Sequence, residues 1–288
     1  MQDAFAAQVI EPFIADYLNG RTPNPCARCN QHIKFGRLSH RARELGAAYL
    51  ATGHYARVGT LPANGRPCLR AAADPAKDQT YFLFALGPAE LGRVLFPIGD
   101  LTKAQVRAEA RRLALPVADK PESMEVCFVP AGDARAFVAA NAPAAALRPG
   151  AIVNETGQEI GQHQGIHGFT VGQRRGLGVG GGPRRYVRGL DAATGTVHVA
   201  PLATFQDRGL RVHSVTWAAG EPATPGTEVR VRIRHRHAAV PARVTSVQDS
   251  RATLAFTDLR PAVTPGQAAV FYQGDLVLGG GWIAGGLT

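Results

Sequence analysis

The chain has 288 residues, of which 45% are hydrophobic, so it is long enough for two or three domains that each bury a core. Its net charge of +10 favours a polyanionic partner such as nucleic acid, although a GC-rich genome that enriches Arg, Ala, Gly and Pro would give the same bias. No apolar run reaches the roughly 18 residues that cross a bilayer, and the opening residues MQDAFAAQVIEPF lack a signal-peptide pattern, so we expect no membrane contact and a cytoplasmic location.

The first part of the chain alternates between helical and strand-like patterns. Residues 5–20 have the apolar spacing of an amphipathic helix that ends at Asn19 and Gly20, and residues 34–46 have similar spacing and stop at Gly46. Residues 47–58 follow as a short apolar strand that breaks at Gly53 and His54. This order of a helix, a strand and a glycine-histidine turn is typical of parallel sheets with binding or catalytic residues at the ends of their strands.

Two helices and a strand are expected before residue 132. A helix begins at KDQTYFLFAL, with Lys77 at its start, and another covers residues 101–116, with Thr102 as its N-cap and Pro116 at its end. Residues 125–129, EVCFV, have the composition of a strand and place Cys127 among apolar neighbours. The segment 1–132 is therefore predicted to be an α/β domain.

The pattern changes after residue 131. An alanine-rich helix leads into short glycine-rich strands around GQEIGQHQGIHGFTVGQRRGLGVGGGPRRYV, which we assign to a small central domain at residues 133–206. Alternating runs such as TEVRVRIRHR and QAAVFYQGDLVLGGGWI then recur at short spacing. This pattern predicts a C-terminal antiparallel β-barrel over residues 207–288.

The cysteines allow several interpretations. Cys26 and Cys29 lie in TPNPCARCN, where they could be half of a zinc site, a redox pair, reactive thiols that Arg28 and Lys34 hold as thiolates, or two inert buried thiols. A structural zinc site is disfavoured, because the other cysteines stand alone and no histidine pair has finger spacing. A cysteine among apolar neighbours, such as Cys127, is more often a core residue than a catalyst, but the polar loop before it leaves room for exposure; Cys68 is interpreted as structural.

Other polar motifs have both a structural and a functional interpretation. Gly53 and His54 could approach a nucleotide, but a lone histidine is more often structural, and Lys77-Asp78-Gln79 could be a solvated helix cap. GQRRGLG lacks the strand-turn-helix frame of a P-loop and better fits contact with an RNA backbone. In VRVRIRHRH the arginines alternate with apolar residues, so they form either a solvated face or an RNA-binding ladder.

Seven ordered blocks together resemble the tRNA-specific 2-thiouridylases: GRTPNPCARCNQHIKFG, YLATGHYARV, KDQTYFLFAL, LFPIGDLTKAQVR, CFV, FTVGQRRGLG and PGQAAVFYQGDLVLGGGWI. The resemblance runs from about residue 8 to the C-terminus. It implies an N-terminal nucleotide-binding domain like that of the adenine nucleotide alpha hydrolases, and replacement of the C2 oxygen of the wobble uridine in tRNA by sulfur. It also implies ATP with Mg²⁺ as cofactor and a sulfur-donor protein as a partner besides tRNA.

The resemblance implies a role for each matching residue. Cys127 corresponds to the persulfide cysteine and Cys29 to the second, nucleophilic cysteine, so that turnover would leave a disulfide between them. Gly53 corresponds to an ATP-contacting glycine. The target base is held by Asn24, Pro25 and Cys26, and the other implied tRNA contacts are His54, Lys77, Asp78, Gln79, Arg234, His235 and Gln267. No resident metal ligand is implied.

Two departures from the family pattern carry expectations. Some members have Asp at the position of Cys26, where the acid is given a general acid/base role. The family's first strand and its SGGxDSS-type pyrophosphate loop have no counterpart in these 288 residues, so we expect a domain without its first strands that binds ATP poorly. The alternatives are a non-catalytic tRNA-binding remnant, and a zinc or redox module built on Cys26 and Cys29.

Overall fold

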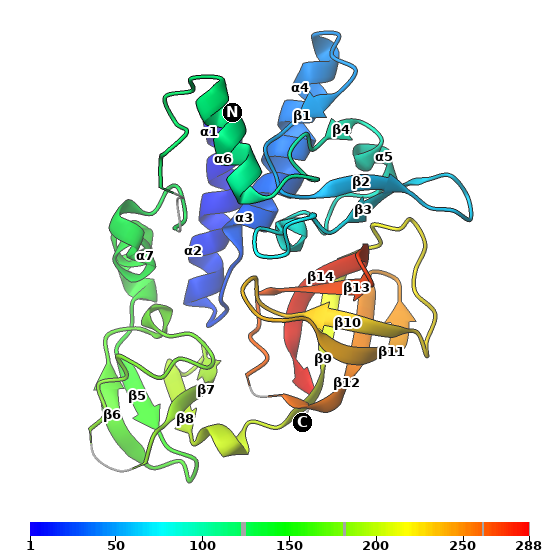
Figure 1. The fold of residues 1–288 in the computed structure, drawn as a ribbon. Helices are drawn as coiled ribbons and strands as arrows, with labels where there is room; N and C mark the ends of the chain where they lie inside the picture. Colours follow the sequence, from blue (N-terminus) through cyan, green and yellow to red (C-terminus); the bar gives the residue numbers. More distant parts are fainter. Residues whose placement is uncertain (122–124, 181–182, 261, 288) are drawn as a thin grey trace.

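The computed structural model describes residues 1–121, 125–180, 183–260 and 262–287. In Figure 1 the N-terminal helices and short strands lie above two sheet structures, a small sheet on one side and a barrel on the other. The predicted fold class, a mixed α/β part followed by a small central part and an antiparallel β-barrel, is confirmed. Within these described ranges, no helix has both the length and the apolar character needed to span a membrane.

Two helical rods begin the chain. The first consists of α1 (Gln2–Phe5), η1 (Ala6–Ile10) and α2 (Glu11–Leu18), and the second of α3 (Pro25–Arg28), η2 (Cys29–Leu38) and α4 (Ser39–Glu44). Both predicted helices are confirmed, and the second begins earlier than expected. Gly20 and Gly46 follow the ends of the two rods with φ of 66° and 84°, a conformation that glycine adopts without the strain of a Cβ.

The strands of the N-terminal part are short. β1 (Leu50–Ala51) and β4 (Val94–Leu95) pair in parallel, which confirms a strand within residues 47–58 but only over two residues. β2 (Arg57–Thr60) and β3 (Pro67–Arg70) form a hairpin. The helices α5 (Pro88–Leu91) and α6 (Lys103–Arg112) follow, and Thr102 caps α6 as predicted, because its Oγ1 accepts a hydrogen bond from the Gln105 amide at 3.3 Å.

Two predicted elements of this part are wrong. The helix expected from Lys77 is only the 3₁₀ turn η3 (Thr80–Phe82), because the apolar residues 81–86 are all buried or partly buried, so tertiary packing overrides helix propensity. The strand expected at residues 125–129 is a turn closed by a hydrogen bond from the Val129 amide to the Val126 carbonyl. The turn directs Phe128 onto Phe13, whose ring centroid lies 5.2 Å away.

The central part contains short helical segments and a sheet. Its elements are η4 (Pro130–Gly132), α7 (Ala134–Asn141), η5 (Ala144–Ala146), β5 (Gly150–Val153), β6 (Glu159–His163), η6 (Ile166–Gly168), β7 (Tyr186–Asp191), β8 (Thr196–Ala200) and η7 (Leu202–Thr204). The strand order is β6-β5-β8-β7, in which β5 and β8 are parallel. Phe137 of α7 packs against Phe13 of α2, so the central part shares a core with the first helical rod.

The barrel consists of β9 (Asp207–Thr216), β10 (Glu228–Arg232), β11 (Val240–Gln248), β12 (Arg251–Arg260), β13 (Ala268–Gln273) and β14 (Leu276–Leu287). Its antiparallel order, β13-β10-β11-β12-β9-β14, is closed by pairing of β13 with β14. The predicted alternation is confirmed at β10, where Val229 and Val231 are buried and Arg230 is exposed.

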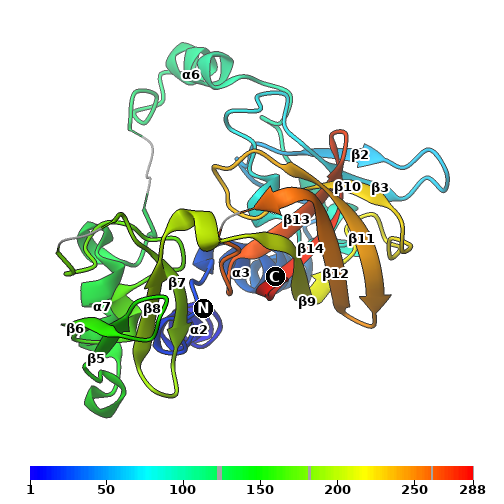
Figure 2. The same cartoon turned by 90° about the horizontal axis from the view of Figure 1, so that it is seen from below.

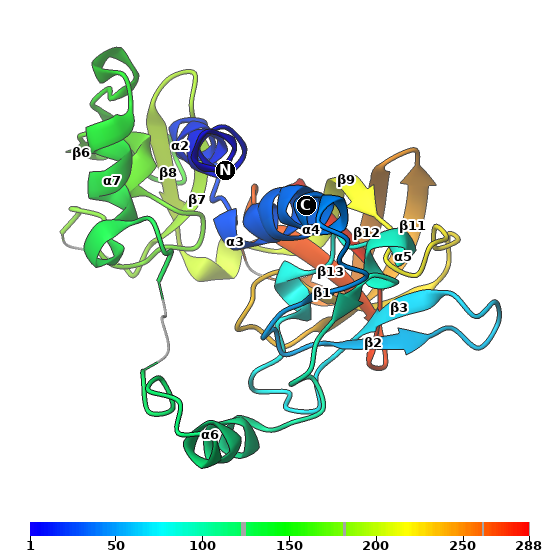
Figure 3. The same cartoon turned by 90° about the horizontal axis from the view of Figure 1, so that it is seen from above.

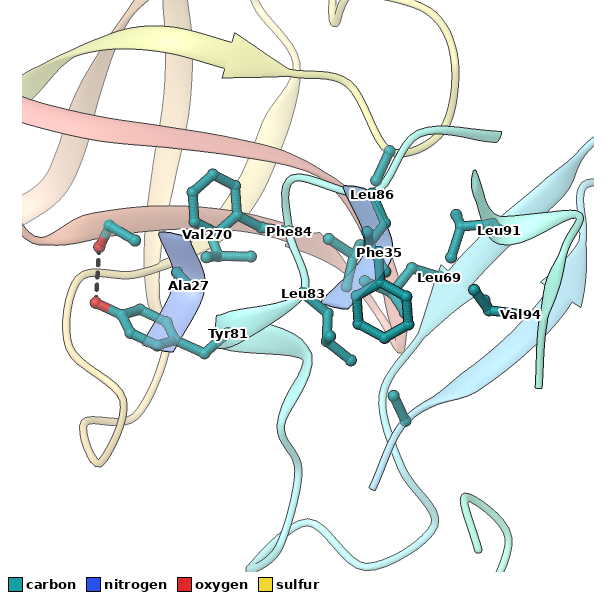
Figure 4. Close-up of a cluster of buried hydrophobic side chains, with 14 of the residues drawn as sticks. Ala27, Phe35, Leu69, Tyr81, Leu83, Phe84, Leu86, Leu91, Val94 and Val270 are labelled. Atoms are coloured by element: carbon teal, nitrogen blue, oxygen red, sulfur yellow. Dashed lines mark hydrogen bonds between the residues drawn. The ribbon is translucent and has the colours of Figure 1, made fainter. Parts of the chain in front are cut away.

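A shared hydrophobic core joins the barrel to the N-terminal part (Figure 4). Phe84 meets Trp282 of β14 edge-to-face with centroids 5.5 Å apart, and Leu276 of β14 pairs with Arg70 of β3. Burying an aromatic or aliphatic side chain of this size contributes roughly 1.5–3 kcal/mol. The helix α6, by contrast, has no buried residue and stands apart from the other elements in Figures 2 and 3.

Candidate active site

The cysteine loop, residues 22–29, contains the end of the link between the two helical rods and the start of the second rod. Asn24 caps α3, because its Oδ1 accepts a hydrogen bond from the Ala27 amide at 3.2 Å, and Pro25 occupies the first helical position. Cys26 is exposed in the first turn, and Cys29 is half-buried one turn later. The start of the second helical rod therefore presents both thiols but gives them different access to solvent.

Cys127 lies close to this loop although it is distant in sequence. A charge on Cys127 raises the pKa of both Cys26 and Cys29, and such an effect requires proximity because Coulomb energy falls with distance. The neighbouring Phe128 and Cys29 both pack against the small core around Val9. Cys127 is exposed, and all four cysteines are free thiols. Cys68 is fully buried in the core, which confirms its structural interpretation.

Burial and the charge of a nearby lysine shift the pKa of the thiols in opposite directions. Burial is the main cause that raises the pKa of Cys26 and of Cys29 above the usual value, while the ammonium group of Lys34 lowers both. Arg28 does not contribute as expected, because its guanidinium stacks over Trp282 at 5.0 Å and lies 3.6 Å from Asp16. The thiols are therefore held mainly in the protonated form, and Lys34 partly offsets this.

The Gly53-His54 turn lies at the carboxyl end of β1. The His54 ring is buried beside Phe35, and its Nδ1 is 2.8 Å from the Thr52 hydroxyl. Burial, assisted by the charge of Lys34, lowers the pKa of His54 to about 4, so the ring is neutral at physiological pH. Lys34 thus acts on His54 and on the cysteines, which places these groups in one site.

Lys77, Asp78 and Gln79 lie next to this turn. Gln79 Oε1 accepts a hydrogen bond from the Tyr55 amide at 2.9 Å, directly after His54. The Asp78 carboxylate is buried and pairs with Arg232 of the barrel at 2.9 Å. The Asp78 side chain therefore makes its contacts within the protein.

The barrel contributes Arg234, His235 and Gln267. Arg234 donates to Thr264 Oγ1 at 2.6 Å and to the Val171 carbonyl of the central part at 3.1 Å. His235 is exposed, and its ring centroid lies 4.5 Å from that of Phe82. Gln267 reaches the cysteine loop directly, because its Nε2 donates to the carbonyls of Thr22 and Pro23.

The predicted arginine ladder does not form a single solvated face. Arg230 is exposed, whereas Arg232 and Arg234 are half-buried and make the internal contacts described above. The other basic motif lines a polar pocket of about 370 Å³, formed by Arg174, Gly176, Leu177, Gly178, Val179, Pro183, Arg184 and Arg185. A pocket lined by three arginines suits a phosphate group.

Two residues at the site were missed from the sequence. Asn30 is buried and donates to the Phe82 carbonyl at 3.0 Å, while its Oδ1 has no partner in the part of the chain that the structure describes. Tyr81 is fully buried and donates to the Ala268 carbonyl at 3.0 Å (Figure 4). The position of Asn30 directly after Cys29 could have indicated a role at the site. Tyr81 lies in an apolar run, where nothing in the sequence sets it apart from core residues.

The residues around Gly53 fit one side of a nucleotide site. Apart from the two flanking residues, no heavy atom of the described residues lies within 4 Å of the position that a Cβ on Gly53 would take, so a ligand can approach this backbone at the carboxyl end of β1. Among the described residues, no group of three or more His, Cys, Asp or Glu side chains could hold a metal ion.

Three family models match the chain: the tRNA methyl transferase HUP domain at residues 1–131, the tRNA methyl transferase PRC-barrel domain at 135–201 and the aminomethyltransferase beta-barrel domain at 207–283. The curated tRNA-specific 2-thiouridylase MnmA of Solibacter usitatus is 47% identical over 98% of this chain and 78% of its own length. Those of Geobacter metallireducens and Roseiflexus castenholzii are 47% and 46% identical, covering 100% and 98% of this chain and 77% and 80% of their own lengths. The chain therefore belongs to the tRNA-specific 2-thiouridylase family.

Proposed function

We propose that this protein is a sulfurtransferase that replaces the C2 oxygen of the wobble uridine in tRNA by sulfur. The names of the curated relatives support the reaction. The observation that carries the proposal is the proximity of Cys127 to the cysteine loop: Phe128, the neighbour of Cys127, packs against the same small core as Cys29, and a charge on Cys127 raises the pKa of both Cys26 and Cys29. Sulfur transfer between thiols requires such proximity, because one sulfur attacks another directly.

The thiols have complementary roles in this reaction. ATP bound beside Gly53 would turn the C2 oxygen into a leaving group. A donor protein first places a sulfur atom on exposed Cys127 as a persulfide, and the terminal sulfur forms a bond to C2 as the activated oxygen departs. The Cys29 thiolate then attacks Sγ of Cys127. The bond between Sγ and the transferred sulfur breaks, its electron pair stays with the new thiocarbonyl group, and a Cys29–Cys127 disulfide remains for an external thiol to reduce.

Proton control at Cys29 follows from its surroundings. The attacking form is the thiolate, yet burial raises the pKa of Cys29. The nearby Lys34 lowers this pKa and favours the reactive form. The neutral ring of His54 does not add a second positive charge at physiological pH.

The tRNA would lie across all three parts of the chain. Asn24, Pro25 and Cys26 would hold the target base, and Cys26 offers the exposed edge. His54, Lys77, Gln79, Arg234 and His235 would contact the surrounding nucleotides, and Asp78 would do so through its backbone because its carboxylate is buried. The net charge of +10 and the arginine pocket at residues 174–185 support a phosphate-led interface.

Cysteine variants of the protein test the proposal. With ATP, a persulfide donor and a substrate tRNA, Cys127→Ser should lose both the persulfide, detected by mass spectrometry, and thiolation. Cys29→Ser should retain the persulfide on Cys127 but lose turnover, while Cys68→Ala, a change in the core, should retain both. Normal thiolation by Cys127→Ser would refute the assignment.

A further inference from the structure

The site holds three thiols, and the proposed sulfur transfer uses two of them. Cys29 and Cys127 take part in the chemistry, whereas Cys26 has only a place beside the target base. Cys26 and Cys127 are exposed, and Cys29 is half-buried. Burial raises the pKa of Cys26 and of Cys29, and the charge of Cys127 raises both further. A third sulfur atom is therefore within electrostatic reach of the two that react.

Cys26 and Cys29 are one helical turn apart at the start of the continuous rod formed by residues 25–44. The Cys29 amide donates to the carbonyls of Pro25 and Cys26, and Cys29 has the dihedral angles of a right-handed helix. In this geometry the two Cα atoms are about 5 Å apart, and the two side chains share one face of the helix. That separation lies within the range of about 4.4–6.8 Å that a disulfide spans.

The place of Cys26 in the first turn allows its backbone to move enough to close such a bond. The hydrogen-bond ladder of the rod starts with the Arg28 amide, which donates to the Asn24 carbonyl at 3.4 Å. The Cys26 amide precedes this ladder, as the first amides of every helix do. Neighbouring Cβ atoms on a helix lie roughly 5–6 Å apart, and a disulfide needs about 4 Å. A small shift of Cys26 therefore suffices, and it breaks no helical hydrogen bond of its own amide.

A disulfide between Cys29 and Cys127 changes the electrostatic surroundings of Cys26. In the reduced site, burial is the main cause that raises the pKa of Cys26. The charges of Cys127 and Cys29 raise it further, and the ammonium group of Lys34 lowers it. Because a disulfide sulfur carries no charge, joining Cys29 to Cys127 removes two of the causes that raise this pKa. The thiolate of Cys26 therefore forms most readily at the stage when the disulfide is present.

We propose that Cys26 is a resolving cysteine, whose thiolate attacks Sγ of Cys29 in the Cys29–Cys127 disulfide after its proton has passed to water. The bond between Cys29 and Cys127 breaks, and its electron pair leaves with Cys127 as a thiolate. A Cys26–Cys29 disulfide forms, so the exchange itself consumes no oxidant or reductant. An external dithiol then reduces this disulfide at the exposed Cys26. The proposal rests on the proposed function, because it adds one step to that reaction and frees Cys127 for the next sulfur atom.

The position of the disulfide after one turnover tests this step in the wild-type protein. Arg28 separates Cys26 from Cys29, so trypsin places the three sulfur atoms of the site in three different peptides. Protein that carries a persulfide is given ATP and tRNA without a reductant, quenched with acid, alkylated and digested. Mass spectrometry should find mainly the Cys26–Cys29 disulfide, together with alkylated Cys127. A disulfide that remains between Cys29 and Cys127, or one between Cys26 and Cys127, would overturn the proposal.

A variant and a mild oxidant separate this step from the proposed function. In Cys26→Ser the Cys29–Cys127 disulfide should persist after one turnover, and Cys127 should resist alkylation until a dithiol is added. One equivalent of diamide, without ATP or tRNA, should give the Cys26–Cys29 disulfide in the wild type, while the buried Cys68 stays reduced. Oxidation that leaves Cys29 joined to Cys127 would overturn the proposal. A protein that forms the Cys26–Cys29 disulfide with diamide but does not thiolate tRNA would refute only the proposed function.

Discussion

Replacing Asp78 by alanine is expected to destabilise the fold strongly. The family resemblance implies a tRNA contact for this residue, but its side chain is 2% exposed and enclosed by hydrogen-bond donors. The carboxylate accepts from the Thr80 hydroxyl at 2.8 Å, from the Ala72 amide at 3.1 Å and from Arg232 at 2.9 Å. The last contact joins the N-terminal part to the barrel.

The size of the effect follows from the charge that the substitution leaves behind. The Arg232 side chain is only 20% exposed, and its Nε already has no hydrogen-bond partner among the described residues. Removing one partner of a buried ion pair costs about 3–5 kcal/mol, because the other charge remains desolvated. We therefore expect Asp78→Ala to lower the free energy of unfolding by about that amount. Adding Arg232→Met removes the stranded charge and should restore about 1–3 kcal/mol.

Urea unfolding of the two single variants and the double variant measures this coupling. Asp100→Ala is the control, since that carboxylate is 83% exposed and lies 3.7 Å from Arg57. It should change the free energy of unfolding by less than about 0.5 kcal/mol. If Asp78→Ala were as stable as the control, or if the effects of Asp78→Ala and Arg232→Met simply added, the interpretation of Asp78 as a structural anion would be wrong.

Three further predictions concern protonation and backbone geometry. The unfolded chain protonates His54 near pH 6.5 and the folded chain only at about 4, so stability from His54 is complete above pH 6.5 and declines as the pH falls towards 4. The contribution of His54 to the free energy of unfolding is up to about 3 kcal/mol. Urea unfolding measured at a series of pH values should show this decline in the wild type but not in His54→Gln. Lys34→Met should raise the pKa of Cys29, because a cation is lost. The pH profile of Cys29 alkylation should therefore shift to higher pH, and a shift to lower pH would contradict this. Gly266→Ala should lower the melting temperature more than Gly274→Ala, because both have positive φ but only Gly266 meets backbone atoms; equal shifts would argue against that contact.

Local patterns predicted much of the fold. The two helical rods, the capped helix α6 and the alternation in β10 each follow from residues that are neighbours in sequence. The turn at residues 125–129 did not, because its apolar residues resemble those of a strand. Phe128 is placed by aromatic contacts with Phe5 and Phe13, which come from the start of the chain. Such non-local packing leaves no local signal.

The candidate site was less accessible from the residues alone. The spacing of Cys26 and Cys29 left zinc, redox, reactive and inert interpretations open, and only the family resemblance connected them with Cys127. The structure brings the three thiols within electrostatic reach of one another. The burial of Asp78 was also hidden in the sequence, because a polar triplet before an apolar run resembles an exposed helix cap.

The positive charge of Lys34 has two consequences that cannot be adjusted independently. It lowers the pKa of Cys29, which favours a thiolate, and it lowers the pKa of His54, which disfavours an imidazolium ion. A protonated His54 would add positive charge and attract polyanionic tRNA more strongly, but burial, assisted by the same lysine that activates the thiol, keeps this ring neutral. The site therefore obtains its electrostatic activation from Lys34 and not from a histidine, whose ordinary pKa lies close to physiological pH.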